Sequence, residues 1–168
     1  MFSLRLRRPR GLMLVVVVML AITIIPKTPH PWLVYNPTAS VPTGLYWITP
    51  TDTVHVGDMV LMQTPPSVAG LADQRRYLPR GVPMLKYVAA LPGDRVCASG
   101  ATISINQRAV AERQARDHLN RVMPWWSGCQ TLGADDLFVL NAKAPLSFDG
   151  RYFGIVSKRL IRGKAKRL

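Results

Sequence analysis

The sequence predicts one mostly-β domain that follows an apolar N-terminal segment. The chain has 168 residues, enough for a single domain, and 48% of them are hydrophobic, which argues against disorder. Its 14 prolines and 12 glycines separate short apolar runs. Short runs divided by turn residues are typical of strands in an all-β or mostly-β domain.

Six short runs are the predicted strands. Two of them are separated by Ser99-Gly100, a two-residue hairpin signal. Helical patterns are limited to Ser67–Tyr77 and Val110–Asn120. The predicted strands are Val54–Met62, Met84–Leu91, Arg95–Ala98, Ala101–Ile105, Leu137–Leu140 and Gly154–Ser157.

The N-terminus predicts a segment that enters a membrane. Residues 1–10 carry four arginines, and residues 11–26 are uncharged and strongly apolar. Arginines before an apolar run remain on the cytoplasmic side, so the rest of the chain is expected in the bacterial periplasm. Residues 11–26 are either a retained inner-membrane anchor or a cleaved signal peptide. Around Thr23–Lys27 the sequence is a poor match to the small-x-small pattern that cleavage requires.

Charge divides the remaining chain into a domain over 27–157 and a basic tail over 158–168. The formal net charge is +13, but the two ends hold ten of the basic residues, and the rest has 12 basic against 9 acidic residues. A nucleic-acid-binding domain would carry its positive charge on the folded core, so no nucleic-acid partner is expected. The tail is expected to be a solvated extension, with anionic lipid headgroups as its most plausible contact.

The cysteines and histidines favour a structural bond over a metal or cofactor site. Cys97 and Cys129 would lie in an oxidising compartment, which favours a disulfide between them. A redox-active pair is the alternative, although such pairs are normally closer in sequence. The three histidines are scattered without metal-ligand spacing, so no metal or other cofactor is expected.

Two segments contain candidate catalytic groups. Ser40 lies between prolines in Asn36–Trp47, where a serine most often makes a turn hydrogen bond. Lys86 interrupts an apolar strand and either faces solvent or points inward. An inward lysine loses hydration, which lowers its pKa, and its neutral amine can then accept a proton from a serine hydroxyl.

The third segment is Ser147–Gly154. Asp149 and Arg151 are two residues apart, so on a strand they would share a face and could pair, with Phe148 pointing to the core. Taken alone, such a pair is most often a solvated surface feature.

In this order, the three segments resemble the signal peptidase I family of Ser/Lys-dyad peptidases. Ser40 in TASVP matches the nucleophile motif, although Val41 replaces the usual Met. Lys86 with LPGDRV matches the lysine motif, and SFDGRYFG over Ser147–Gly154 matches the closing motif. SVPTGLYW, PWWSGC and the closing motif resemble the TraF-type peptidases of plasmid conjugation more closely. The match is weak over about 97–135, which is expected to be a variable insertion.

The resemblance implies a role for each matching residue. Ser40 would be the nucleophile, Lys86 its general base, and Ser147 the hydroxyl that orients the lysine. The oxyanion would bind the Ser40 backbone N–H and the Thr38 hydroxyl. Asp149 and Arg151 would form a supporting pair behind the motif that contains Lys86.

The resemblance also implies a function. The protein would be a membrane-anchored serine endopeptidase that processes a pilin precursor through an acyl-serine intermediate, with cyclisation of the product as an option. One alternative is a general signal peptidase that cleaves secretory precursors. Another is a non-catalytic scaffold component of an envelope apparatus.

Overall fold

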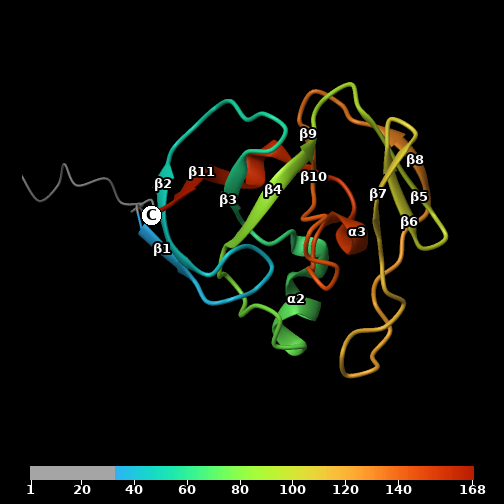
Figure 1. Cartoon of the computed structure of the whole chain (residues 1–168), viewed down its shortest axis with the longest axis horizontal. Helices are drawn as coiled ribbons and strands as arrows, with labels where there is room; N and C mark the ends of the chain where they lie inside the picture. Colours follow the sequence, from blue (N-terminus) through green and yellow to red (C-terminus); the bar gives the residue numbers. More distant parts are fainter. Residues whose placement is uncertain (1–32) are drawn as a thin grey trace, which may run out of the picture. The chain divides into compact units, whose positions relative to one another are not determined.

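The computed structural model describes residues 33–168, which form two antiparallel sheets (Figure 1). The larger sheet has the strand order β1-β2-β11-β3-β4-β9-β10. Consecutive strands are not always neighbours, because the last long strand of the chain lies inside the sheet. The strands are β1 (Leu33–Asn36), β2 (Gly44–Thr49), β3 (Met59–Met62), β4 (Met84–Ala90), β9 (Asp136–Val139), β10 (Val156–Ser157) and β11 (Ile161–Arg167).

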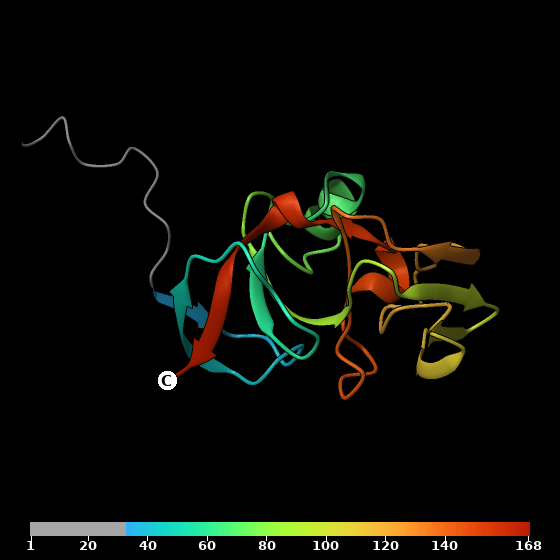
Figure 2. The ribbon, with the colours of Figure 1, turned by 90° about the horizontal axis from the view of Figure 1, so that it is seen from above.

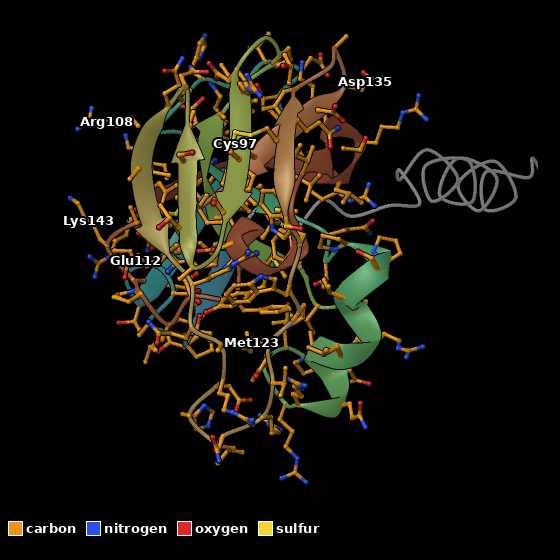
Figure 3. All side chains as sticks on the ribbon, turned by 90° about the vertical axis from the view of Figure 1, so that its right-hand side faces the viewer. Cys97, Arg108, Glu112, Met123, Asp135 and Lys143 are labelled. Atoms are coloured by element: carbon orange, nitrogen blue, oxygen red, sulfur yellow. A yellow bond between two sulfur atoms is a disulfide. The ribbon has the colours of Figure 1, made fainter. Side chains whose placement is uncertain are left out.

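The smaller sheet has the order β7-β6-β5-β8 and lies on the right of Figure 1. Its strands come from the region expected to be an insertion. Cys97 on β5 is directly opposite Cys129 on β8, and the two form a disulfide, visible beside the Cys97 label in Figure 3. The strands are β5 (Arg95–Ser99), β6 (Thr102–Ile105), β7 (Arg108–Glu112) and β8 (Gly128–Thr131).

Short helices occupy three connections. Helix α2 (Pro66–Gln74) joins β3 to β4 and begins with proline, whose fixed φ suits the first helical position. Helix α3 (Gly150–Phe153) follows β9, and the 3-10 helix η1 (Lys158–Leu160) precedes β11. Gly150 is required where α3 meets β9, because a Cβ there would lie 2.6 Å from the Val139 carbonyl oxygen.

Three groups of buried apolar residues form the core. One of them combines Ala90 and Phe138 of the larger sheet with Val96 and Ile103 of the smaller sheet, so the two sheets share a core. Another packs Val41, which follows Ser40, together with Leu85, which precedes Lys86. The third lies among β3, β4, β9 and β10. The second group therefore brings the predicted nucleophile segment to the strand that carries the predicted base.

Most of the predicted strands are confirmed. The structure has β4 (Met84–Ala90) within the predicted Met84–Leu91, the β5–β6 hairpin around Ser99-Gly100, and β9 (Asp136–Val139) over most of the predicted Leu137–Leu140. The other two predicted strands are shorter than expected: only β3 forms within Val54–Met62, and only β10 within Gly154–Ser157. Helix α2 confirms the helical pattern at Ser67–Tyr77.

The predicted helix over Val110–Asn120 is wrong. This stretch begins in strand β7, which pairs with β6, and continues as a loop in which Arg116 bridges to Val122. Strand β7 lies at the edge of a small sheet and has no fully buried residue, so its apolar positions do not show a clear period of two. Tertiary pairing overrides the weak helical pattern of this segment.

The expectation of a solvated basic tail over 158–168 is also wrong, and the domain extends to the end of the chain. Figure 2 shows β11, in red, between β2 and β3. Its residues alternate, with Gly163 buried and Ala165 packed on the core, while Arg162 and Lys166 are exposed. The sequence does not reveal this strand, because the residues that face the core, Gly163 and Ala165, are small, while the residues between them are basic. Lys164 is further stabilised by an ion pair 2.8 Å from Asp58.

The predictions for residues 1–10 and 11–26, and for the first six residues of the predicted domain, lie outside the described residues. Over 33–168, no helix is both long enough and apolar enough to span a membrane.

Candidate active site

The loop between β1 and β2 carries Ser40, and one buried amide sets its shape. Asn36 is 8% exposed, and its Nδ2 donates to the backbone carbonyls of Thr38, Val41 and Pro42 at 2.8–3.1 Å. Its Oδ1 accepts hydrogen bonds from the backbone N–H and the hydroxyl of Thr38. The Asn36 side chain thus supplies hydrogen bonds to backbone groups of the loop that no neighbouring strand pairs with. The loop therefore has a defined conformation around the serine.

Ser40 is half-buried, and its hydroxyl contacts Thr38. The two hydroxyl oxygens are 3.2 Å apart. Thr38 already donates its only hydroxyl hydrogen to Asn36 Oδ1 at 2.8 Å, so Ser40 is the donor in this pair. For Thr38 to serve as an oxyanion donor, as the resemblance implies, its hydroxyl would have to rotate away from Asn36.

Lys86 points inward, which resolves one of the alternatives left open by the sequence. It is the third residue of β4 and is 3% exposed. Its Nζ donates to Ser147 Oγ at 3.2 Å. Burial lowers the pKa of Lys86 from 10.5 to about 8, with Asp149 opposing this change and Arg151 adding to it. A substantial fraction of the amine is therefore neutral near physiological pH.

Asp149 and Arg151 form a buried ion pair, but they do not lie on a strand as predicted. Asp149 is the N-cap of α3 and accepts a hydrogen bond from the backbone N–H of Arg151. The Arg151 guanidinium binds both Asp149 oxygens, with Nε to Oδ1 at 2.9 Å. The pair is 0–1% exposed, so it is not a solvated surface feature. A capping aspartate favours a helix start, which explains the error in the strand prediction.

Arg151 also fixes the loop that carries Ser147. Its two terminal nitrogens donate to the backbone carbonyls of Asn141, Ala144 and Pro145 at 2.7–3.1 Å. The backbone N–H of Ser147 itself donates to the Ala144 carbonyl. The ion pair does not hydrogen-bond to Lys86; it holds the loop that presents Ser147 to the lysine.

Asn141 was not predicted from the sequence and connects this loop to the nucleophile. Its Nδ2 donates to the Ser40 carbonyl, while its backbone N–H donates to Asp149 Oδ2 at 3.1 Å. The only sequence signal is its position immediately after a buried strand. Asn36 was likewise missed, although it opens the motif that contains Ser40.

The structure brings the predicted catalytic, oxyanion and supporting residues into one region, while Cys97 and Cys129 lie in the smaller sheet, and the proposed dyad is not hydrogen-bonded. Val41 and Leu85 share a core cluster, and these residues are adjacent to Ser40 and Lys86. Among residues 33–168, no hydrogen bond joins Ser40 to Lys86, since each hydroxyl or amine contacts a different partner. Proton transfer between them would require the Ser40 hydroxyl to rotate from Thr38.

An open strand edge borders Lys86. The backbone N–H of Leu140 donates to the Tyr87 carbonyl at 2.9 Å, so Tyr87 directs its polar backbone groups toward β9. In an antiparallel sheet this direction alternates along the strand, so Leu85 faces the same side. Strand β9 ends at Val139, opposite Val88, and no described strand pairs with Leu85 on that side.

Within the described part of the chain, no three histidine, cysteine or acidic side chains are arranged to hold a metal ion.

Comparisons with known proteins identify the family. The family described as "Signal peptidase, peptidase S26" matches residues 7–168. The chain is 32% identical over 137 residues to "Plasmid transfer protein TraF" of Escherichia coli, covering 75% of this chain and 76% of that protein. It is 36% identical over 132 residues to "Conjugal transfer protein TraF" of Agrobacterium tumefaciens (strain 15955), covering 72% and 73%.

Among solved structures, a signal peptidase I from Enterococcus faecalis V583 has a TM-score of 0.40 and 20% identity, covering 67% of this chain and 97% of that one. The family match extends over nearly the whole chain, and the two relatives named above cover most of its length. The chain therefore belongs to the signal peptidase family, peptidase S26, a family of serine peptidases.

Proposed function

We propose that the protein is a membrane-anchored endopeptidase of plasmid conjugation, with Ser40 as nucleophile and Lys86 as general base. The observation that carries the proposal is the buried Lys86 amine, 3.2 Å from Ser147 Oγ and with a pKa lowered to about 8. A buried lysine without a structural ion-pair partner is costly, and strongly lowered lysine pKa values cluster at functional sites.

The chemistry starts when the Ser40 hydroxyl turns from Thr38 toward Lys86. The neutral amine takes the hydroxyl proton as Oγ attacks the scissile carbonyl. The C–N bond then breaks, the proton passes from Lys86 to the leaving amine, and an acyl-serine remains. Ser147 keeps the amine in place throughout, and the Ser40 backbone N–H, assisted by a rotated Thr38 hydroxyl, binds the oxyanion.

The substrate would bind as an extended strand beside Leu85. The unpaired backbone N–H and carbonyl of this residue can accept a peptide by β-strand addition. Leu85 immediately precedes Lys86, so a strand in this position would place a peptide bond beside the amine. Affinity would then come mainly from backbone hydrogen bonds.

A pilin precursor is the substrate class we propose. The two relatives at 32% and 36% identity are plasmid or conjugal transfer proteins by name, which supports a role in conjugation. The acyl-serine would be released by water or by the amino terminus of the same substrate, which would give a cyclic product. The expected periplasmic location and the apolar segment at 11–26 agree with a membrane-bound precursor.

Mass spectrometry of a co-expressed candidate pilin tests this proposal. With the wild-type protein, loss of the C-terminal residues indicates hydrolysis, and loss of one further water indicates cyclisation. The Ser40→Ala variant should leave the precursor unprocessed. Processing that survives this substitution would eliminate Ser40 as the nucleophile. Equal, unprocessed masses with both proteins would favour the scaffold alternative.

The general signal peptidase alternative predicts a different result. It requires the protein to restore growth in a strain depleted of its own signal peptidase. We expect no such rescue.

A further inference from the structure

We infer that Asn141 is a positioning residue for the nucleophile: its side-chain amide holds the Ser40 carbonyl and so fixes the backbone of the reacting residue. The inference rests on the proposed role of Ser40. It extends that proposal to a residue that contacts neither the lysine nor the serine hydroxyl.

Asn141 is buried and has a partner for each of its polar groups. It is 8% exposed, and its backbone N–H and carbonyl are bound by Asp149 and Arg151 at 3.1 and 2.7 Å. Its Oδ1 accepts a hydrogen bond from the Lys143 backbone N–H at 3.1 Å, and its Nδ2 donates to the Ser40 carbonyl. The residue is thus fixed by the ion pair on one side and reaches the nucleophile on the other.

The hydrogen bond from Asn141 to Ser40 joins two segments that lie far apart in the sequence. Asn36 and Tyr46, which also hydrogen-bond to this loop, belong to the loop's own strands. Over residues 33–168, the Asn141–Ser40 contact is the one hydrogen bond between the nucleophile loop and the segment that carries Ser147. This amide is therefore the hydrogen-bonded link between the described segments that carry Ser40 and Ser147.

Fixing the Ser40 carbonyl restricts the ψ angle of Ser40. It also holds in place the Ser40 Cα, from which both the backbone N–H, the proposed oxyanion donor, and the side chain with Oγ project. Small errors in the position of a nucleophile reduce the rate of acylation greatly, while they alter binding of a remote part of the substrate little. Loss of the amide should thus lower kcat more than it raises KM.

Two variants separate positioning from a role in building the loop. Asn141→Asp keeps the shape and retains an acceptor for the Lys143 N–H, but it replaces the donor to Ser40 with a carboxylate oxygen. Asn141→Ala removes both contacts and adds no charge. A control outside the site is Asn106→Ala in the turn between β6 and β7, where the lost amide also makes two side-chain hydrogen bonds, to the Arg95 backbone N–H and to Asp94 Oδ1.

The test uses the full chain in detergent with a quenched fluorescent peptide that spans the processing region of a pilin precursor. Both Asn141 variants should show kcat reduced at least ten-fold on the alkaline plateau, with KM within about two-fold. The pKa of the acid limb should stay near that of the wild type in Asn141→Ala, because Lys86 is untouched. Asn106→Ala should lose thermal stability but keep its kcat.

Two outcomes would overturn the inference. If Asn141→Asp kept wild-type kcat, the residue would only be building the loop. The same conclusion would follow if the kcat of Asn141→Ala fell no further than that of Asn106→Ala. Cleavage that persisted in Ser40→Ala would instead remove the proposed function itself, so the two failures are distinguishable.

Discussion

The two sheets of this protein keep their conformation by different means. The larger sheet contains the buried Lys86 on β4, and the start of α3, which follows β9, contains the buried Asp149–Arg151 ion pair. In the smaller sheet every residue of the edge strand β8 is exposed, and a disulfide joins β8 to β5. The first region contains a lysine whose burial reduces stability, whereas the second is stabilised by a covalent bond and carries no proposed catalytic group.

The comparison indicates that the proposed catalytic site lowers the free energy of unfolding, because it requires a buried lysine. Desolvation of Lys86 favours unfolding, yet it also provides the neutral amine. The surrounding hydrogen bonds of Arg151 and Asn141 compensate by fixing the loop around it. Changes in the larger sheet should therefore alter activity and stability independently, while changes in the smaller sheet should alter stability alone.

The largest expected effect is that of Lys86→Met, which should lower activity and raise stability. Removal of the general base should reduce kcat by at least about 10³-fold. At pH 7 the lysine is mostly protonated in both states, so most of the cost of its lowered pKa applies, and the free energy of unfolding should rise by about 3 kcal/mol in the variant. Denaturant unfolding and peptide cleavage measure the two effects.

The gain in stability should depend on pH. The native state binds fewer protons than the unfolded state between pH 8 and 10.5, so the wild type gains stability as pH rises through this window. The advantage of Lys86→Met should shrink over the same range. An advantage that stays constant with pH would mean that Lys86 is not desolvated.

The next largest effect should come from Arg151→Met. The substitution leaves Asp149 buried without its cation and removes the donors to the 141–147 loop. Breaking a buried pair in this way costs about 3–5 kcal/mol. Arg159→Met is the matched control, because its pair with Asp135 is 3.9 Å long and largely exposed. The control should change the free energy of unfolding by less than about 1 kcal/mol, and equal losses would contradict a special role for the buried pair.

Removing the disulfide should affect only stability. The double variant Cys97→Ala/Cys129→Ala opens a loop with a sequence separation of 32 residues, which predicts a loss of about 3–4 kcal/mol. Its kcat, measured where the protein remains folded, should stay within about two-fold of the wild type. A large fall in kcat would show that the smaller sheet contributes to the active site.

The smallest effect concerns the pH profile of the wild type. Only the neutral form of Lys86 can accept the serine proton, and its pKa is about 8. The value of kcat/KM should therefore fall about ten-fold per unit below pH 8 and level off above it. A profile that rose only near pH 10.5 would mean that burial does not activate the amine.

The sequence by itself determined the parts of this protein whose signals are local. Short apolar runs between glycines and prolines predicted most of the strands, and the three motifs identified Ser40, Lys86 and Ser147 as candidates. The alternation in β11 was hidden because its inward residues, Gly163 and Ala165, are small while its outward residues are charged. Composition therefore suggested a tail where the chain forms an interior strand of the larger sheet.

Only the tertiary structure decided which way Lys86 points and what surrounds it. A lysine within an apolar strand can face solvent or core, and the choice depends on which strands become its neighbours. The same holds for Asp149, which caps a helix instead of lying on a strand, and for Asn141, whose amide reaches a residue 101 positions away in the chain. Contacts between such distant residues leave no periodic or local trace in the sequence, because they exist only once the sheet has formed.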